Sequence, residues 1–94
     1  MSNTSLKMRA LRGATTASAN TAAAMTEAVD ELLDALISNN GLQGDQVLSA
    51  TFSVTADLDA MFPASLARRR PGWDGVALLD CQQMRVQGDL PRCI

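Results

Sequence analysis

The sequence has 94 residues, which is enough for one domain with a thin hydrophobic core. Its formal net charge is −2, and its Lys and Arg residues are not gathered in one run, which argues against nucleic acid or an anionic membrane surface as a partner. It contains no histidine, so Ser-His and Cys-His nucleophilic machinery is excluded and the commonest metal ligand is missing.

The first elements predicted are a tail and a short strand. Residues 1–6 are polar and carry no pattern, so we expect a flexible tail followed by a single domain over residues 7–94. Lys7–Leu11 alternates as a strand does, and the same alternation places Arg12 near its end, where a charged side chain can reach a cleft. Gly13 ends this strand, and the small, hydroxyl-rich residues after it predict a loop.

The clearest pattern predicts a helix over residues 21–39. Asn20 or Thr21 is suited to cap its first turn, and Gly41 is a common signal for the end of a helix. Apolar residues recur at spacings of three and four, which is typical of a helix with one face in the core. We interpret this stripe as core packing, and it comprises Met25, Ala28, Val29, Leu32, Leu33, Leu36 and Ile37.

A strand over residues 47–55 is predicted next. Leu48, Ala50, Phe52 and Val54 alternate there with serines and threonines. Because successive side chains of a strand point to opposite faces, one face is apolar and the other is lined with hydroxyl groups.

The last third of the chain predicts a short helix and further strands. The helix covers residues 63–70, with Pro63 near its first position. Residues 76–79 are a compact apolar run typical of a strand, which continues with polar insertions to Val86. After a turn, residues 92–94 have the composition of the start of another strand.

Two features indicate a cytoplasmic protein. The N-terminal residues lack the continuous apolar stretch of a signal peptide, and no stretch approaches the roughly 20 apolar residues that span a bilayer. Cys81 and Cys93 are too few for a disulfide framework, so we expect free thiols in a reducing compartment.

Three blocks, in this order along the chain, resemble one family. They are RGATT at Arg12–Thr16, TADLDAMFPA at Thr55–Ala64 and PRCI at Pro91–Ile94. With the intervening helix and the pair Gly72-Trp73, they are similar to the AroH class of monofunctional chorismate mutase over nearly the whole chain. RGATT alone is a weak signal, whereas the three blocks together are highly specific.

The resemblance implies a fold, an assembly and an activity. The fold is of the α/β (α+β) class, with a mixed β-sheet and helices packed on one side. Three subunits join their sheets into a trimeric pseudo-α/β-barrel, and each active site lies between two subunits. The activity is that of an isomerase, which rearranges chorismate to prephenate in aromatic amino acid biosynthesis without a cofactor or a metal.

This chemistry suits a chain that has no histidine. The rearrangement is unimolecular, moves no proton and forms no covalent intermediate. The protein has to hold the flexible substrate in its compact reactive shape and to stabilise the negative charge that develops on the ether oxygen. Because the substrate is a dianion, arginine suits its carboxylates through paired, planar hydrogen bonds.

The resemblance also implies substrate-binding residues. Arg12 in RGATT matches an arginine that contacts the substrate, whereas outside this motif it would be interpreted as a solvated charge at the end of a strand. Phe62, Ala64 and Arg68 match positions that wall the cleft from the neighbouring subunit. Phe62 could equally be an ordinary core residue, and Arg68 a solvated charge at a helix end.

Leu78 and Leu79 match strand positions beside the substrate. The sequence at the end of this strand differs from that of the family. Many members read CxQE where this chain has Asp80-Cys81-Gln82-Gln83, so Gln83 replaces a glutamate that accepts a hydrogen bond from the substrate hydroxyl. We expect Asp80 to take over this role, with Gln83 hydrogen-bonded to it. Alternatively Asp80 is only a strand-end charge, although aspartate is disfavoured in an apolar strand without a partner.

The C-terminal block bears on activity. In the family an arginine that faces the ether oxygen directly follows PRCI, so its position comes after Ile94, and a tyrosine that closes the cleft lies farther on; this sequence contains no tyrosine. Loss of a fixed cation at a developing charge costs orders of magnitude in rate, so we expect these 94 residues alone to be impaired. The alternative function is that of a non-catalytic trimeric ligand-binding or scaffold relative of the mutase.

Overall fold

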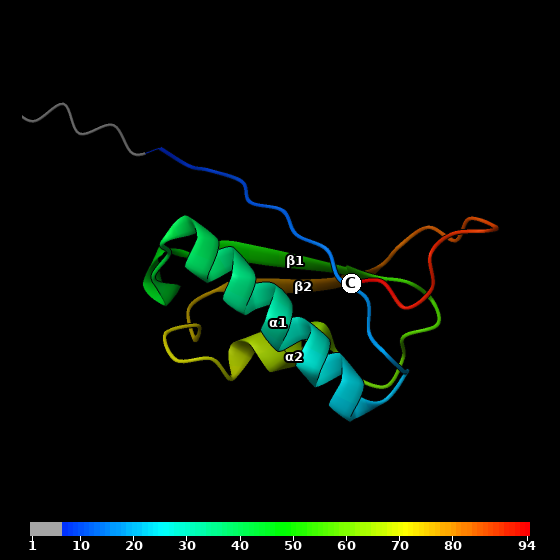
Figure 1. Ribbon diagram of the computed structural model, residues 1–94. Helices are drawn as coiled ribbons and strands as arrows, with labels where there is room; N and C mark the ends of the chain where they lie inside the picture. Colours follow the sequence, from blue (N-terminus) through cyan, green and yellow to red (C-terminus); the bar gives the residue numbers. More distant parts are fainter. Residues whose placement is uncertain (1–6) are drawn as a thin grey trace, which may run out of the picture.

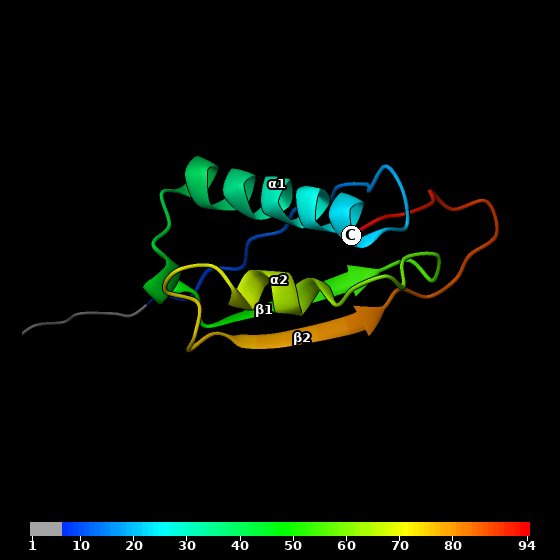
Figure 2. The ribbon, with the colours of Figure 1, turned by 90° about the horizontal axis from the view of Figure 1, so that it is seen from below.

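The structure is a computed structural model that describes residues 7–94, so the tail predicted over residues 1–6 lies outside the described residues. It contains two α-helices and a two-stranded parallel sheet, and both helices lie on the same side of that sheet (Figure 1, Figure 2). This arrangement confirms the predicted α/β (α+β) class with helices on one side. No helix within residues 7–94 is long and apolar enough to cross a membrane.

Helix α1 (Ala22–Asn40) confirms the helix predicted over residues 21–39. Thr21 is the N-cap, and its hydroxyl accepts a hydrogen bond of 3.1 Å from a backbone N–H of the first turn. Gly41 follows in the left-handed conformation, with φ of 61°, and its N–H closes the last turn. The buried face of the helix comprises Met25, Ala28, Val29, Leu32 and Leu33, in agreement with the predicted core stripe.

The sheet consists of β1 (Ser49–Val54) and β2 (Ala77–Gln82), which run parallel, with Phe52 opposite Asp80. The predicted strands starting at residues 47 and 76 are therefore confirmed with slightly different bounds. Parallel strands require a crossover connection, and the short helix after β1 lies within it. The carboxyl ends of both strands consequently meet at one edge of the sheet, where open sheets with such connections commonly bind ligands.

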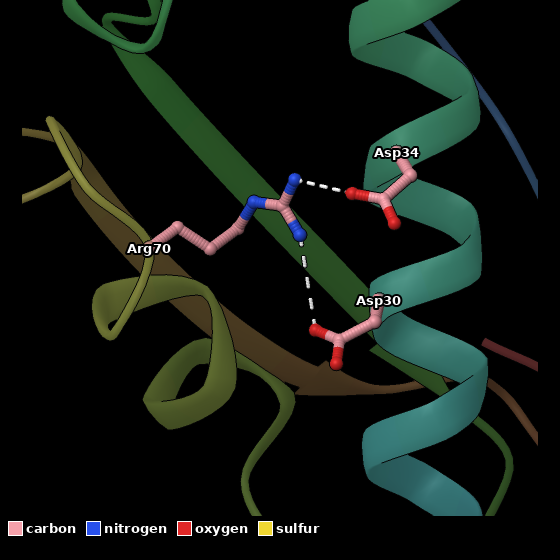
Figure 3. A network of polar contacts seen from close by, with 3 residues as sticks. All are labelled: Asp30, Asp34 and Arg70. Carbon is pink, nitrogen blue, oxygen red and sulfur yellow. Dashed lines mark hydrogen bonds and ion pairs between the residues drawn. The ribbon is translucent and has the colours of Figure 1, made fainter.

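Helix α2 (Pro63–Arg68) packs against both α1 and the sheet, on the same side of the sheet as α1 (Figure 2). It begins with Pro63 at its first position, as predicted, and ends two residues earlier than the predicted residue 70. Arg70, just after α2, is hydrogen-bonded to Asp34 and lies 3.8 Å from Asp30, both on α1 (Figure 3). Because both carboxylates are largely exposed to water, this contact contributes little to the stability of the fold.

The two faces of the sheet differ in what covers them. Phe52 is buried towards the helices, flanked by the half-buried Ala50 and Val54, as the alternation predicts. Leu48 was assigned to the same face but precedes β1 and is 65% exposed. The opposite face, here called the open face, is exposed along both strands, and its residues are Ser49, Thr51, Ser53, Ala77, Leu79 and Cys81.

The strand predicted over residues 7–11 was wrong. These residues are exposed and, within the described chain, belong to no strand ladder. Gly13 lies against α1 instead, so close that a Cβ there would come within 2.7 Å of a methyl carbon of Leu32. Alternation identifies an extended segment, but a strand also needs a neighbour with which to exchange hydrogen bonds.

The predicted continuation of β2 to residue 86 was wrong, whereas the start of a strand predicted at residues 92–94 is confirmed as far as an antiparallel bridge. β1 ends at Val54, whose carbonyl still accepts from the N–H of Gln83, and beyond this bond β2 has no partner in the described residues. Residues 92–94 form only a single antiparallel bridge, between Thr16 and Cys93. The sheet within residues 7–94 is therefore parallel, and the antiparallel bridge lies outside its two strands.

Candidate active site

The first and the last of the three sequence blocks lie side by side as antiparallel backbone. Thr15 and Ile94 exchange two backbone hydrogen bonds of 3.0 Å each, and the N–H of Ala17 donates to the carbonyl of Arg92 over 2.8 Å. The Arg92 guanidinium also donates through Nε to the Ala17 carbonyl, at 2.9 Å. RGATT and PRCI are therefore joined directly, although they stand at opposite ends of the chain.

The middle block joins this pair through Asp57. The carboxylate of Asp57 accepts from the hydroxyl of Thr55 and from the backbone N–H of Arg92, with N–O distances of 3.0 and 3.1 Å. Thr55 in turn exchanges hydrogen bonds of 3.0 and 3.1 Å with the backbone of Cys93. All three blocks thus meet beyond the carboxyl end of β1.

The geometry around Asp57 explains two local properties. The hydrogen bond from the Thr55 hydroxyl is the largest cause that holds the pKa of the Asp57 carboxyl below its usual range. Burial opposes it as the next largest effect, and the backbone N–H and charge of Arg92 add to the lowering. Arg92 has a φ of 52°, which a residue with a side chain rarely adopts. The double contact from its N–H to Asp57 stabilises that conformation.

Asp80 faces the helices. Its Oδ1 accepts from the backbone N–H of Ala64 over 2.9 Å, in the first turn of α2. Ala64 is buried, while Phe62, which precedes the helix, is 73% exposed. Asp80 therefore fixes the start of α2, and with it the position of Phe62.

Gln83 does not bind Asp80, so the hydrogen bond predicted between these side chains was wrong. The Nε2 group of Gln83 donates instead to Oδ2 of Asp89, at 2.9 Å. Residues three positions apart at the end of a strand point to opposite faces, which separates the two side chains. Gln83 lines a cavity of about 340 Å³ beyond the strand ends, together with Thr55, Asp57 and Asp89.

The remaining predicted site residues are placed as follows. Leu78 is half-buried on the helix side of β2, and Leu79 lies on the open face. Arg68 is exposed in the last turn of α2. Arg12 is exposed and makes no hydrogen bond or ion pair with any residue in 7–94. The single chain therefore brings Asp80, Ala64 and Phe62 together but does not bind Arg12 to them.

Sequence reasoning missed Asp57 and Asp89, which the structure connects to the blocks and to Gln83. Asp57 lies inside TADLDAMFPA, and Asp89 lies in the turn before residues 92–94, but neither position carries a local pattern that marks it as functional. A second cavity, of about 630 Å³, lies between α1 and the residues after α2 and is lined by none of the predicted site residues. Within residues 7–94 no group of three or more His, Cys, Asp or Glu side chains is arranged to hold a metal ion.

The chain is similar to known proteins over most of its length. The family model described as chorismate mutase type I matches residues 8–94. The sequence is 35% identical to chorismate mutase AroH of Bacillus subtilis over 89 residues, which is 95% of this chain and 70% of that protein. It is 41% identical to chorismate mutase AroH of Thermus thermophilus over 88 residues, 93% of this chain and 71% of that protein. A solved structure, a chorismate mutase from Clostridium thermocellum, matches with a TM-score of 0.79 and 42% identity, over 85% of this chain and 70% of that one.

Proposed function

The chain belongs to the chorismate mutase type I family and is a chorismate mutase, an isomerase, and we propose that its active site is built around the meeting point of the three sequence blocks. The observation that carries this proposal is the set of hydrogen bonds among Thr15, Asp57 and Arg92 and their neighbours. They join the blocks beyond the carboxyl end of β1, at the sheet edge that favours ligand binding.

The reaction converts chorismate to prephenate: one C–O bond breaks and one C–C bond forms within the same molecule. No proton and no external electron is required, so the residues only have to bind, orient and stabilise charge. We assign Arg12 to a substrate carboxylate, because its guanidinium is exposed and has no partner within residues 7–94. The acceptor for the substrate hydroxyl lies at the end of β2, where Asp80 and Gln83 stand.

We further propose that the site is completed by a neighbouring subunit of a homotrimer. The open face carries no charged residue, and its Leu79 is 59% exposed, which is typical of a surface covered in an assembly. Phe62 and Arg68 are likewise exposed, as expected for residues that wall the cleft of an adjoining subunit, whereas Ala64 is buried and Leu78 is half-buried. A cytoplasmic location and a role in aromatic amino acid biosynthesis fit this activity and the two free cysteines.

The test is chorismate turnover by Arg12→Ala beside the matched control Arg9→Ala, since Arg9 is an exposed arginine in the same segment. Hydrogen bonds to charged groups contribute about 1.5–3 kcal/mol, so kcat/KM should fall about 10-fold to 100-fold for Arg12→Ala and stay unchanged for Arg9→Ala. Equal kcat/KM values for the two variants would show that Arg12 does not bind the substrate.

A further inference from the structure

The side chain of Gln83 is held in one orientation by Asp89. Nε2 of Gln83 donates to Oδ2 of Asp89 at 2.9 Å, and Oδ1 of Asp89 accepts from the N–H of Leu90, also at 2.9 Å. Both carboxylate oxygens are therefore engaged, one within the turn and one with Gln83. The backbone of Gln83 is fixed as well, because its N–H donates to the Val54 carbonyl over 2.7 Å.

The direction of this hydrogen bond follows from chemistry. An ionised carboxylate only accepts, whereas a glutamine side chain has a donor end and an acceptor end. Only the NH₂ end of Gln83 can face Asp89, so the oxygen Oε1 must point away from it. Oε1 accepts no hydrogen bond from residues 7–94 and is not sealed from solvent, and Gln83 lines the 340 Å³ cavity beyond the strand ends.

We infer that Asp89 is a positioning residue, which turns the side-chain oxygen of Gln83 towards the substrate so that Gln83 accepts the hydrogen bond of the substrate hydroxyl. The inference rests on the proposed function and makes it more specific. Asp80 faces the helices, where its Oδ1 is bound to Ala64, whereas Gln83 lines the cavity beyond the strand ends. A glutamine can serve as this acceptor only if its amide is prevented from flipping, and Asp89 prevents the flip.

Asp89→Asn is the sharpest perturbation. Asparagine keeps an oxygen for the N–H of Leu90 but places an NH₂ group where Oδ2 stood, facing the NH₂ of Gln83. Gln83 then flips to accept from Asn, and its own NH₂ points into the cavity. Because the site then offers a donor where an acceptor is required, kcat/KM should fall about 10-fold to 100-fold, as for a hydrogen bond replaced by an unpaired polar contact.

The reciprocal change provides a rescue. Gln83→Glu alone places two carboxylates in contact and should also lose activity, because like charges at this distance repel. When Gln83→Glu is combined with Asp89→Asn, the NH₂ group of the new asparagine donates to the new glutamate. The other carboxylate oxygen of that glutamate then faces the cavity, so kcat/KM should return to the parent value or exceed it. Asp74→Asn is the matched control, since Asp74 is exposed and makes no side-chain hydrogen bond within residues 7–94.

Two readouts separate this inference from the proposed function. The side-chain NH₂ signals of Gln83 in ¹⁵N spectra should shift in Asp89→Asn but not in Asp74→Asn. The value of kcat/KM should fall in each of the single variants Asp89→Asn and Gln83→Glu and recover in the double variant. If Asp89→Asn alters neither the signals nor the rate while Asp80→Asn abolishes turnover, Asp80 is the acceptor and the inference is overturned, with the proposed function intact. If Asp89→Asn does not fold, a folded double variant that is no more active than Gln83→Glu alone would overturn it equally. A protein that neither binds nor converts chorismate overturns the proposed function itself.

Discussion

Replacing Leu79 by Asp tests whether the open face of the sheet is the contact between subunits. Complete burial of a leucine side chain contributes about 1.5–3 kcal/mol. Since Leu79 is 59% exposed in the single chain, about 1–2 kcal/mol per subunit, or about 3–5 kcal/mol per trimer, remains to be gained on assembly. An aspartate buried there would instead lose its hydration at a cost of several kcal/mol per ion, so the association should fail.

The assay is the molar mass in solution, by light scattering over a range of protein concentrations. The parent chain should show the mass of a trimer, and Leu79→Asp should show that of a monomer. Leu48→Asp is the control, because Leu48 is 65% exposed but lies before β1 and outside the open face. A trimeric Leu79→Asp would show that another surface makes the contact, and a monomeric parent would refute the trimer.

Three further predictions concern the core, the pH dependence and the open face. Met25→Ala removes a fully buried side chain and should lower the free energy of unfolding by about 2–5 kcal/mol, measured by urea denaturation, with no matching loss expected for the exposed Met84→Ala. Because the folded-state pKa of Asp57 is depressed, its contribution to stability is present above the ordinary value of 3.8 and is lost as the pH falls below it. The melting temperature of Asp57→Asn should therefore fall less steeply at acidic pH than that of the parent chain. An equally steep fall in the variant would exclude this carboxylate as the cause. Cys81 is exposed on the open face, so a thiol reagent should label it slowly in the trimer and rapidly in Leu79→Asp, and equal labelling rates would contradict burial of that face.

The elements that sequence predicts correctly are those whose signal is local. The stripe of α1 with its Thr21 cap, and the alternation of β1, depend on residues within one turn or one strand. The segment at residues 7–11 has a similar alternation, yet it is no strand, because pairing depends on a neighbour that lies elsewhere in the chain. Periodicity alone therefore cannot separate an extended segment from a paired strand.

The candidate site was predictable only in part for the same reason. The three blocks, matched as motifs, name the segments that meet, but their hydrogen bonds join residues 35 positions apart, such as Asp57 and Arg92. No local pattern predicts such a contact. The pairing of Gln83 with Asp89 depends on where β2 ends, which in turn depends on the length of β1.

The structure also separates the roles of the two arginines that the blocks contain. The backbone of Arg92 is in the left-handed conformation, which favours glycine, because other residues adopt it at a cost of about 1–2 kcal/mol. Arginine is accommodated there because Asp57 holds its N–H while its Nε donates to Ala17, which ties the last block to the first. Its guanidinium is thus partly used within the fold, whereas that of Arg12 is free within residues 7–94. This difference supports Arg12 as the arginine that binds the dianionic substrate. It predicts that Arg92→Ala lowers both the free energy of unfolding and kcat/KM, whereas Arg12→Ala lowers kcat/KM alone.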